Sequence, residues 1–530
     1  MATLEPQPTA TRRRGPLRRL VAGALSDDTL SKKASLNMVA SVLDYGARIV
    51  VGLLINPILV SRLGDLVFGV YQVLTQLIHY ATPAGGRPSQ ALKWTIAHDQ
   101  YSTEYDEKRR QVGSALTVWF LFLPLLAVVG GVLAWFAPLL VAAPAHLHLP
   151  IRVAAGLLVL DLVAAGLLTI PQSVVQGENL GYKRMGLSTV VIFVGGGLTA
   201  TAAVLGGGLV GVAAAAVATT VFTGLVFWWV ARSYVPWFGI SRPALAAVWS
   251  FVALSGWFLL WNLVMQLMRA SDVVVLGIAA SPELVTVYTL SRYVPEAIFG
   301  AVAIMVSGIM PGLGGLIGAG DMGRAITVRR ESMSLTWLIA TASGAAFLLW
   351  QESFLRLWVG EEYYPGRLAT LLIIVMILQF AFIRNDSSII DLTLKLRAKV
   401  LLGLLSAGVA VAAAVLLLKT WETGIAALAA GFIAGRSILT LAYPWLVARY
   451  LGLSAWGQIT GAVRPAVVCA VLFAGAVAAA PLTRADSWLT LIFFGGLSLA
   501  VLGAASFYLG LSARQRGQLS RRLRQVLRRA

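Results

Sequence analysis

Long apolar runs follow one another along the whole chain and are separated by short polar breaks. A run of about 20 apolar residues is what a helix needs to cross the hydrocarbon core of a bilayer. The breaks are turn-forming sequences such as RLGD, LGGG and ASPE. The pattern predicts fourteen transmembrane helices, at 36–61, 66–84, 111–141, 150–176, 185–205, 210–232, 248–279, 284–311, 330–352, 367–391, 399–418, 424–447, 462–481 and 487–511.

Composition excludes a soluble protein. Of the 530 residues 58% are hydrophobic and only 12% are charged, and a soluble domain cannot hide that much apolar surface from water. The runs are too long and too continuous for the alternating strands of an outer-membrane barrel. The fold class predicted is therefore an all-α polytopic membrane protein.

The positive charge is distributed as the positive-inside rule requires. The net charge is +19, but the basic residues gather in the two terminal tails and in alternate loops. With both termini on one side, segments in or flanking that side hold 31 of the 42 Lys and Arg residues, and the opposite side holds 6. We therefore expect a multi-pass protein of the cytoplasmic (inner) membrane with both termini cytoplasmic, and no nucleic acid partner.

An internal repeat relates the two halves of the chain. Residues 59–77 resemble residues 276–294 at an offset of 217, so that Val70-Tyr71 falls on Val287-Tyr288. Six predicted helices separate the copies, which gives both the same orientation. This predicts two parallel six-helix lobes related by a pseudo-two-fold axis along the membrane normal. The predicted organisation is a basic tail (1–35), an N-lobe (36–232), a linker (233–247), a C-lobe (248–447), helices 13 and 14 (448–511) and a basic tail (512–530).

Polar residues interrupt the repeat-related helices on one face. In the first helix, Ser41, Asp44, Arg48 and Gly52 recur at spacings of three and four. The helices at 66–84, 248–279 and 284–311 also carry polar stripes. A charge at mid-bilayer costs roughly 2.5–3.5 kcal/mol, so these side chains are expected to face a hydrated cavity between the lobes.

Five arginines give the expected cavity its character, because a guanidinium is a permanent planar cation suited to phosphate oxygens. Amides and tyrosines on the same stripes could contact sugar rings, although packing is the commoner role of a single tyrosine. The candidate residues for binding an anionic head group are Arg48, Arg269, Arg292, Arg384, Arg436, Gln76, Asn262, Gln266, Tyr71 and Tyr288.

Acidic residues and one histidine on the same helices suit a second role, coupling transport to H⁺ or Na⁺ or pairing with the arginines. The helical spacings suggest three pairs, Asp44–Arg48, Arg269–Asp272 and Arg292–Glu296, and simple stapling of a helix explains any one of them equally well. The candidates for ion coupling or pairing are Asp44, Asp272, Glu296, His79 and Asp161.

No enzymatic or metal chemistry is indicated. The chain has a single cysteine, Cys469, within an apolar run, and no G-x-x-x-x-G-K-[ST] nucleotide motif. His146 and His148 form an H-L-H in a short loop with no carboxylate or cysteine nearby. We therefore expect no catalytic residue, no metal site and no cofactor other than the coupling ion.

A set of ordered motifs resembles the polysaccharide flippase branch of the multidrug/oligosaccharidyl-lipid/polysaccharide exporter superfamily. The motifs run over most of the chain, from about residue 37 to 450. They are Asn37 opening the first helix, P-x-x-x-x-x-L-G-x-x-x-F-G-x-Y from Pro57 to Tyr71, DVVVLG (272–277), VY (287–288), MPG (310–312), LWVGEEY (357–363) and LTLKLRAK (392–399).

The resemblance implies a V-shaped fourteen-helix fold that moves a polyprenyl-diphosphate-linked oligosaccharide across the membrane by alternating access, for cell-surface polysaccharide such as exopolysaccharide or O-antigen. Its implied partners are the lipid-linked glycan and membrane lipids, with a glycan polymerase or glycosyltransferase as a candidate. The nearest alternative is the drug/cation antiporter branch, which Asp44 fits. A peptidoglycan-precursor flippase and a polytopic glycan polymerase or transferase rank lower.

Overall fold

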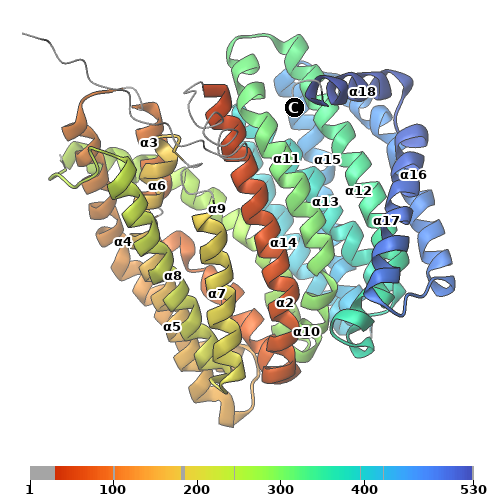
Figure 1. Ribbon diagram of the computed structural model, residues 1–530, viewed down its shortest axis with the longest axis horizontal. Helices are drawn as coiled ribbons and strands as arrows, with labels where there is room; N and C mark the ends of the chain where they lie inside the picture. The colour runs from red at the N-terminus through yellow and green to blue at the C-terminus, as the bar shows by residue number, and fades with distance from the viewer. Residues whose placement is uncertain are drawn as a thin grey trace, which may run out of the picture.

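The computed structural model describes residues 30–86, 88–99, 102–180, 186–243, 245–393, 396–421 and 423–527. Within these residues the chain is helical and contains no strand, and the helices run side by side (Figure 1). Most of the predicted N-terminal tail lies outside the described residues.

The predicted spans fall on the observed helices, and two of them, 150–176 and 284–311, are each divided between two helices. In the described part of the chain, 13 helical segments are long and apolar enough to cross a membrane. The first of them, Val39–His79, contains two predicted spans, because Gly64 alone, with φ of 75°, breaks the helix between them. The predicted turns at 205–208 and 280–283 also separate helices, where Gly206 and Gly208 take positive φ and the Ser281 hydroxyl caps the next helix. The fourteen-span prediction is confirmed.

The first lobe is built around α5, which packs against α4 and α8. In Figure 1 it forms the orange-to-yellow side of the molecule, beside the long red α2. The helices of this lobe are α2 (Leu30–His79), α3 (Pro88–His98), α4 (Tyr105–Leu140), α5 (His148–Leu168), α6 (Ile170–Gly177), α7 (Leu187–Val204) and α8 (Gly208–Tyr234).

The second lobe is built around α13 and α15, which pack against each other and are largely buried. Helices α16 and α17 pack on α12 at the outside and remain mostly exposed. The helices of this part are α9 (Leu245–Ala279), α10 (Pro282–Ser291), α11 (Tyr293–Gly318), α12 (Met322–Trp358), α13 (Arg367–Leu392), α14 (Leu396–Thr420), α15 (Ile425–Leu451), α16 (Ala455–Ala479), α17 (Trp488–Ala505) and α18 (Ala513–Leu527).

The start of α2 and the helix α18 lie at the same end of the bundle, which we call the terminal end (Figure 1). The turn at Gly64 and the start of α10 lie at the opposite end, which we call the far end. Because the first described span starts at this end and the last one leads to α18 at the same end, the number of spans between them is even, as the sequence predicts.

The two copies of the internal repeat touch each other at the far end. The Thr286 hydroxyl donates a hydrogen bond to the Asp65 carbonyl oxygen at 2.7 Å. In the matching contact, a Cβ added to Gly69 would lie 1.8 Å from the Pro282 carbonyl oxygen. At the offset of 217, Asp65 is equivalent to Pro282 and Gly69 to Thr286, so a two-fold rotation exchanges the two contacts. The two copies of the repeat therefore contact each other at the predicted pseudo-two-fold axis.

Gly69 permits this close approach of α2 and α10, and we expect Gly69→Ala to lower the free energy of unfolding by about 1–3 kcal/mol through overpacking. Gly46 provides the matched control, because it lies in the same helix and a Cβ there would meet nothing within 4 Å. Thermal melting of the purified protein in detergent measures both. Equal melting temperatures for Gly69→Ala and Gly46→Ala would contradict the axis contact.

Candidate functional site

A polar cavity of about 260 Å³ lies where the first lobe meets α9 and α13. One face of α9 forms most of its wall, and four residues predicted for the substrate site line it together. Among the described residues that line it, none is acidic. They are Thr82, Pro83, Trp261, Asn262, Met265, Gln266, Arg269 and Arg384.

Arg269 and Arg384 make this inter-lobe cavity positive. Each guanidinium lies within electrostatic reach of the other. The Asp391 carboxylate also lies near Arg384, but it forms an ion pair with Lys399. Within the described part of the chain neither arginine has a carboxylate partner in an ion pair. Two planar cations with free donors are the arrangement that binds phosphate or diphosphate oxygens.

A buried charge network joins α9 to α10 and α11 beside this cavity. The Asp272 carboxylate accepts a hydrogen bond from the Tyr288 hydroxyl at 2.6 Å and from an Arg292 guanidinium nitrogen at 2.9 Å. The other Arg292 terminal nitrogen pairs with Glu296. Asp272, Tyr288 and Arg292 are all buried. These predicted site residues are therefore brought together and bond to one another, and none of them lines the inter-lobe cavity.

Of the ion pairs predicted from helical spacing, the structure contains one in this network, and another has a different partner. Arg292 and Glu296 form the expected pair one turn apart. Asp272 pairs with Arg292, twenty residues away on another helix, whereas Arg269 lines the inter-lobe cavity. Helical spacing reports only neighbours on one helix, and the break between α10 and α11 brings in the actual partner.

The Arg436 side chain is buried and surrounded by backbone carbonyl groups and aromatic rings. Its guanidinium donates to the carbonyl oxygens of Met268 and Met376. It lies 5.1 Å from the ring centre of Phe380 and 5.2 Å from that of Phe432. The side chain thus ties α15 to α9 and α13, which is a packing role, since its donors are directed at the chain itself.

Asp44 and Arg48 diverge, although they lie one turn apart on α2. The Asp44 carboxylate is buried and accepts a hydrogen bond from the Thr189 hydroxyl of α7 at 3.3 Å. The Arg48 side chain is exposed. Among the described residues the two form no ion pair, so the Asp44–Arg48 pair expected within this helix is absent.

A separate polar group lies inside the first lobe. The Asp161 carboxylate of α5 has the Thr220 hydroxyl and the His79 ring as neighbours, and it lies near Tyr71. One of its carboxylate oxygens is buried without a hydrogen bond among the described residues. Gln76 is half-buried on the same face of α2 as His79. The predicted coupling residues Asp161 and His79 are thus adjacent, and they are apart from the inter-lobe cavity.

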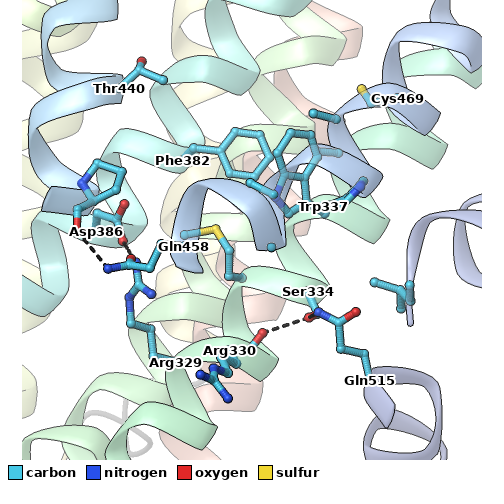
Figure 2. Close-up of a pocket in the computed structure, with 18 of the residues that line it drawn as sticks. Arg329, Arg330, Ser334, Trp337, Phe382, Asp386, Thr440, Gln458, Cys469 and Gln515 are labelled. Atoms are coloured by element: carbon cyan, nitrogen blue, oxygen red, sulfur yellow. Dashed lines mark hydrogen bonds and ion pairs between the residues drawn. The ribbon is translucent and has the colours of Figure 1, made fainter. Parts of the chain in front are cut away.

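A further cavity, of about 1020 Å³, opens within the second lobe (Figure 2). A buried ion pair lies at its wall, with 2.8 Å between Arg329 and Asp386. The sequence did not predict this pair, because the ninth predicted span begins at residue 330, whereas α12 begins at Met322. The available signal was Asp321, whose side chain caps α12 by accepting from the backbone N–H of Arg324.

No family model matches the sequence, and no curated protein matches it. Solved structures are similar in fold. An inward-facing conformation of a multidrug resistance MATE family transporter of the MOP superfamily has a TM-score of 0.61 at 15% identity, with 82% of this chain and 98% of that chain covered. An outward-facing conformation of such a transporter has a TM-score of 0.55 at 15% identity, with 79% and 96% covered.

A MOP superfamily transporter from Pyrococcus furiosus is also similar, with a TM-score of 0.53 at 15% identity and coverage of 79% and 96%. It is described as having a binding pocket of reverse polarity that suggests a different function. These likenesses show a shared fold and do not single out the polysaccharide branch. The chain is a multi-pass membrane protein with the two-lobed fold of the MATE transporters.

Proposed function

We propose that this protein is an alternating-access transporter that carries a lipid-linked glycan with a diphosphate head across the membrane. The observation that supports this most is the inter-lobe cavity, where Arg269 and Arg384 meet and no acidic residue lines the wall. A cavity of this charge favours an anionic head over a cationic drug.

Hydrogen bonds at the far half of α2 support a conformation in which the lobes are joined at that end. The first segment of α2 accepts bonds at the Ile49 and Leu53 carbonyl oxygens, from the Tyr293 hydroxyl at 2.6 Å and the Trp358 indole N–H at 2.7 Å. The Tyr363 hydroxyl donates to the Asp65 carboxylate at 2.6 Å. The TM-score is likewise higher with the inward-facing neighbour than with the outward-facing one.

Transport then needs no covalent step. The arginine donors replace the water that surrounds the diphosphate, so that the charged head enters the protein at low cost while the lipid tail stays in hydrocarbon. Breaking the far-end hydrogen bonds and closing the terminal end would expose the head on the other side. Asp161 with His79 is the group we assign to coupling with H⁺ or Na⁺, since it is separate from the arginines.

A drug/cation antiporter is the second candidate. It is favoured by the multidrug description of the neighbouring structures and by the partly buried Asp161, which could bind a cation or a proton. In this case the inter-lobe arginines would not contact the substrate.

The test compares two cargoes in vesicles that contain only this protein. One cargo is a polyprenyl-diphosphate-linked glycan, scored by its exposure to a membrane-impermeant glycosidase. The other is a cationic dye, scored by uptake under a proton or sodium gradient. We expect glycan translocation and no dye transport. Transport of the dye without translocation of the glycan would favour the antiporter. Absence of glycan translocation under both a proton and a sodium gradient would reject the proposal.

A further inference from the structure

The cavity in the second lobe changes from charged to apolar along its length. Near the terminal end it is lined by Arg329, Arg330 and Arg514, with Asp386 as the one acidic residue among the described residues that line it. Asp386 is already paired with Arg329, which leaves a net charge of +2 at this end. In Figure 2, Arg329, Arg330 and Gln515 lie on one side of the cavity.

Deeper in the cavity the wall is apolar. The Trp337 and Phe382 rings pack with their centres 4.3 Å apart, and Figure 2 shows them between the arginines and Cys469. Phe473 and Ala470 of α16 continue this wall. The volume of about 1020 Å³ is at the upper end of the roughly 300–1,000 Å³ that small-molecule sites occupy.

Some residues of the cavity wall carry buried polar atoms that lack partners. The Nε–H donor of Arg329 is buried, on a side chain that is only 7% exposed, and it has no hydrogen bond among the described residues. The amide oxygens of Gln379 and Gln458 are likewise buried without a partner there. A buried unpaired donor or acceptor costs about 1–3 kcal/mol, and all three residues belong to the wall of this cavity.

Helix α18 covers the charged end. Its Gln515 side-chain amide donates to the Ser334 hydroxyl at 3.0 Å, and Leu519 is buried. The sequence after Leu519 is rich in arginine. A positively charged segment is repelled by a cavity that is already positive. The occupant must therefore be anionic at one end and apolar at the other, which excludes the chain's own tail.

We propose that this cavity binds an anionic glycerophospholipid, with its phosphate at Arg330 and Arg514 and an acyl chain against Trp337 and Phe382. The site is distinct from the inter-lobe cavity and holds a resident membrane lipid, so it does not depend on which substrate is transported. A bound lipid would fasten α16 and α18 to the second lobe.

The single cysteine allows a direct test, because Cys469 lines the apolar part of the cavity. The reaction rate of Cys469 with a small methanethiosulfonate is measured in uncharged detergent with phosphatidylglycerol, phosphatidylcholine or glycerol 3-phosphate added. We expect phosphatidylglycerol to slow the reaction about tenfold, the effect of one added charge-assisted hydrogen bond. Phosphatidylcholine and glycerol 3-phosphate should slow it far less.

The variant Arg330→Gln/Arg514→Gln should abolish the preference for phosphatidylglycerol. Arg324→Gln is the matched control, since Arg324 is an exposed arginine of α12 that does not line the cavity. Native mass spectrometry of the same samples counts bound lipid and remains decisive if Cys469 reacts too slowly to measure. Equal effects of the two lipids, equal protection by glycerol 3-phosphate, or a preference unchanged in the double variant would each overturn the proposal.

Discussion

Arg292→Met should lower the free energy of unfolding by about 3–5 kcal/mol, the cost of leaving one member of a buried ion pair without its partner. The change removes the guanidinium from the Asp272 carboxylate, which is only 2% exposed and would keep as donors only the Tyr288 hydroxyl and the Val273 backbone N–H. The donors of the neighbouring Arg436 are directed at backbone carbonyls and cannot replace it. Thermal and denaturant unfolding of the purified protein in detergent measures the loss.

The same network supplies the control. The Glu296 side chain, which is 48% exposed, also pairs with Arg292, and because solvent screens it we expect Glu296→Gln to cost less than about 1 kcal/mol. Replacing both charges, as in Asp272→Leu with Arg292→Met, should restore most of the stability, because no charge is then left buried. If Glu296→Gln were as destabilising as Arg292→Met, the network would not be held by the Asp272–Arg292 pair.

Arg269→Gln/Arg384→Gln should reduce transport of an anionic lipid-linked glycan by about 100-fold or more at normal expression. A hydrogen bond to a charged group contributes about 1.5–3 kcal/mol, or roughly tenfold to a hundredfold for each arginine. Both side chains line the inter-lobe cavity and lack carboxylate partners among the described residues, so their loss should leave the fold intact. Initial rates in vesicles, together with melting temperatures, separate the two effects.

Glutamine keeps a polar amide and removes the charge, so the double variant tests the guanidinium groups while leaving polar side chains in the cavity. Arg324→Gln removes an exposed charge at the terminal end, outside the cavity, and should transport normally. Unchanged transport in the double variant would show that the substrate does not use these arginines.

The spans could be predicted from sequence because the bilayer fixes the length of an apolar helix, and the turns at Gly64 and Ser281 end helices in any context. The repeat could also be predicted, because the segments at Asp65 and Pro282 pack closely against each other and both need residues that permit this contact. The charge of the inter-lobe cavity followed from two arginines on predicted inward faces.

Which polar residues pair with one another could not be predicted, because contacts between helices leave no periodic signal. The Asp272 partner lies across a helix break, and Arg292 and Arg436, expected at the substrate, are buried among internal partners instead. The cavity in the second lobe was missed for the same reason, since α12, α13 and α16 contribute to it from distant parts of the chain.

We propose that a diphosphate-headed lipid binds between the lobes and shifts them between two conformations. Spin-label distances measure this directly in a Cys469→Ser background. One pair, Glu104→Cys with Arg324→Cys, spans the lobes at the terminal end, and the other, His146→Cys with Glu361→Cys, spans them at the far end. All four residues are exposed.

Adding a polyprenyl diphosphate should shorten the terminal-end distance and lengthen the far-end distance, and Arg269→Gln/Arg384→Gln should abolish both changes. Distances that do not respond to the ligand, or that respond equally in the double variant, would contradict binding of the diphosphate by these arginines.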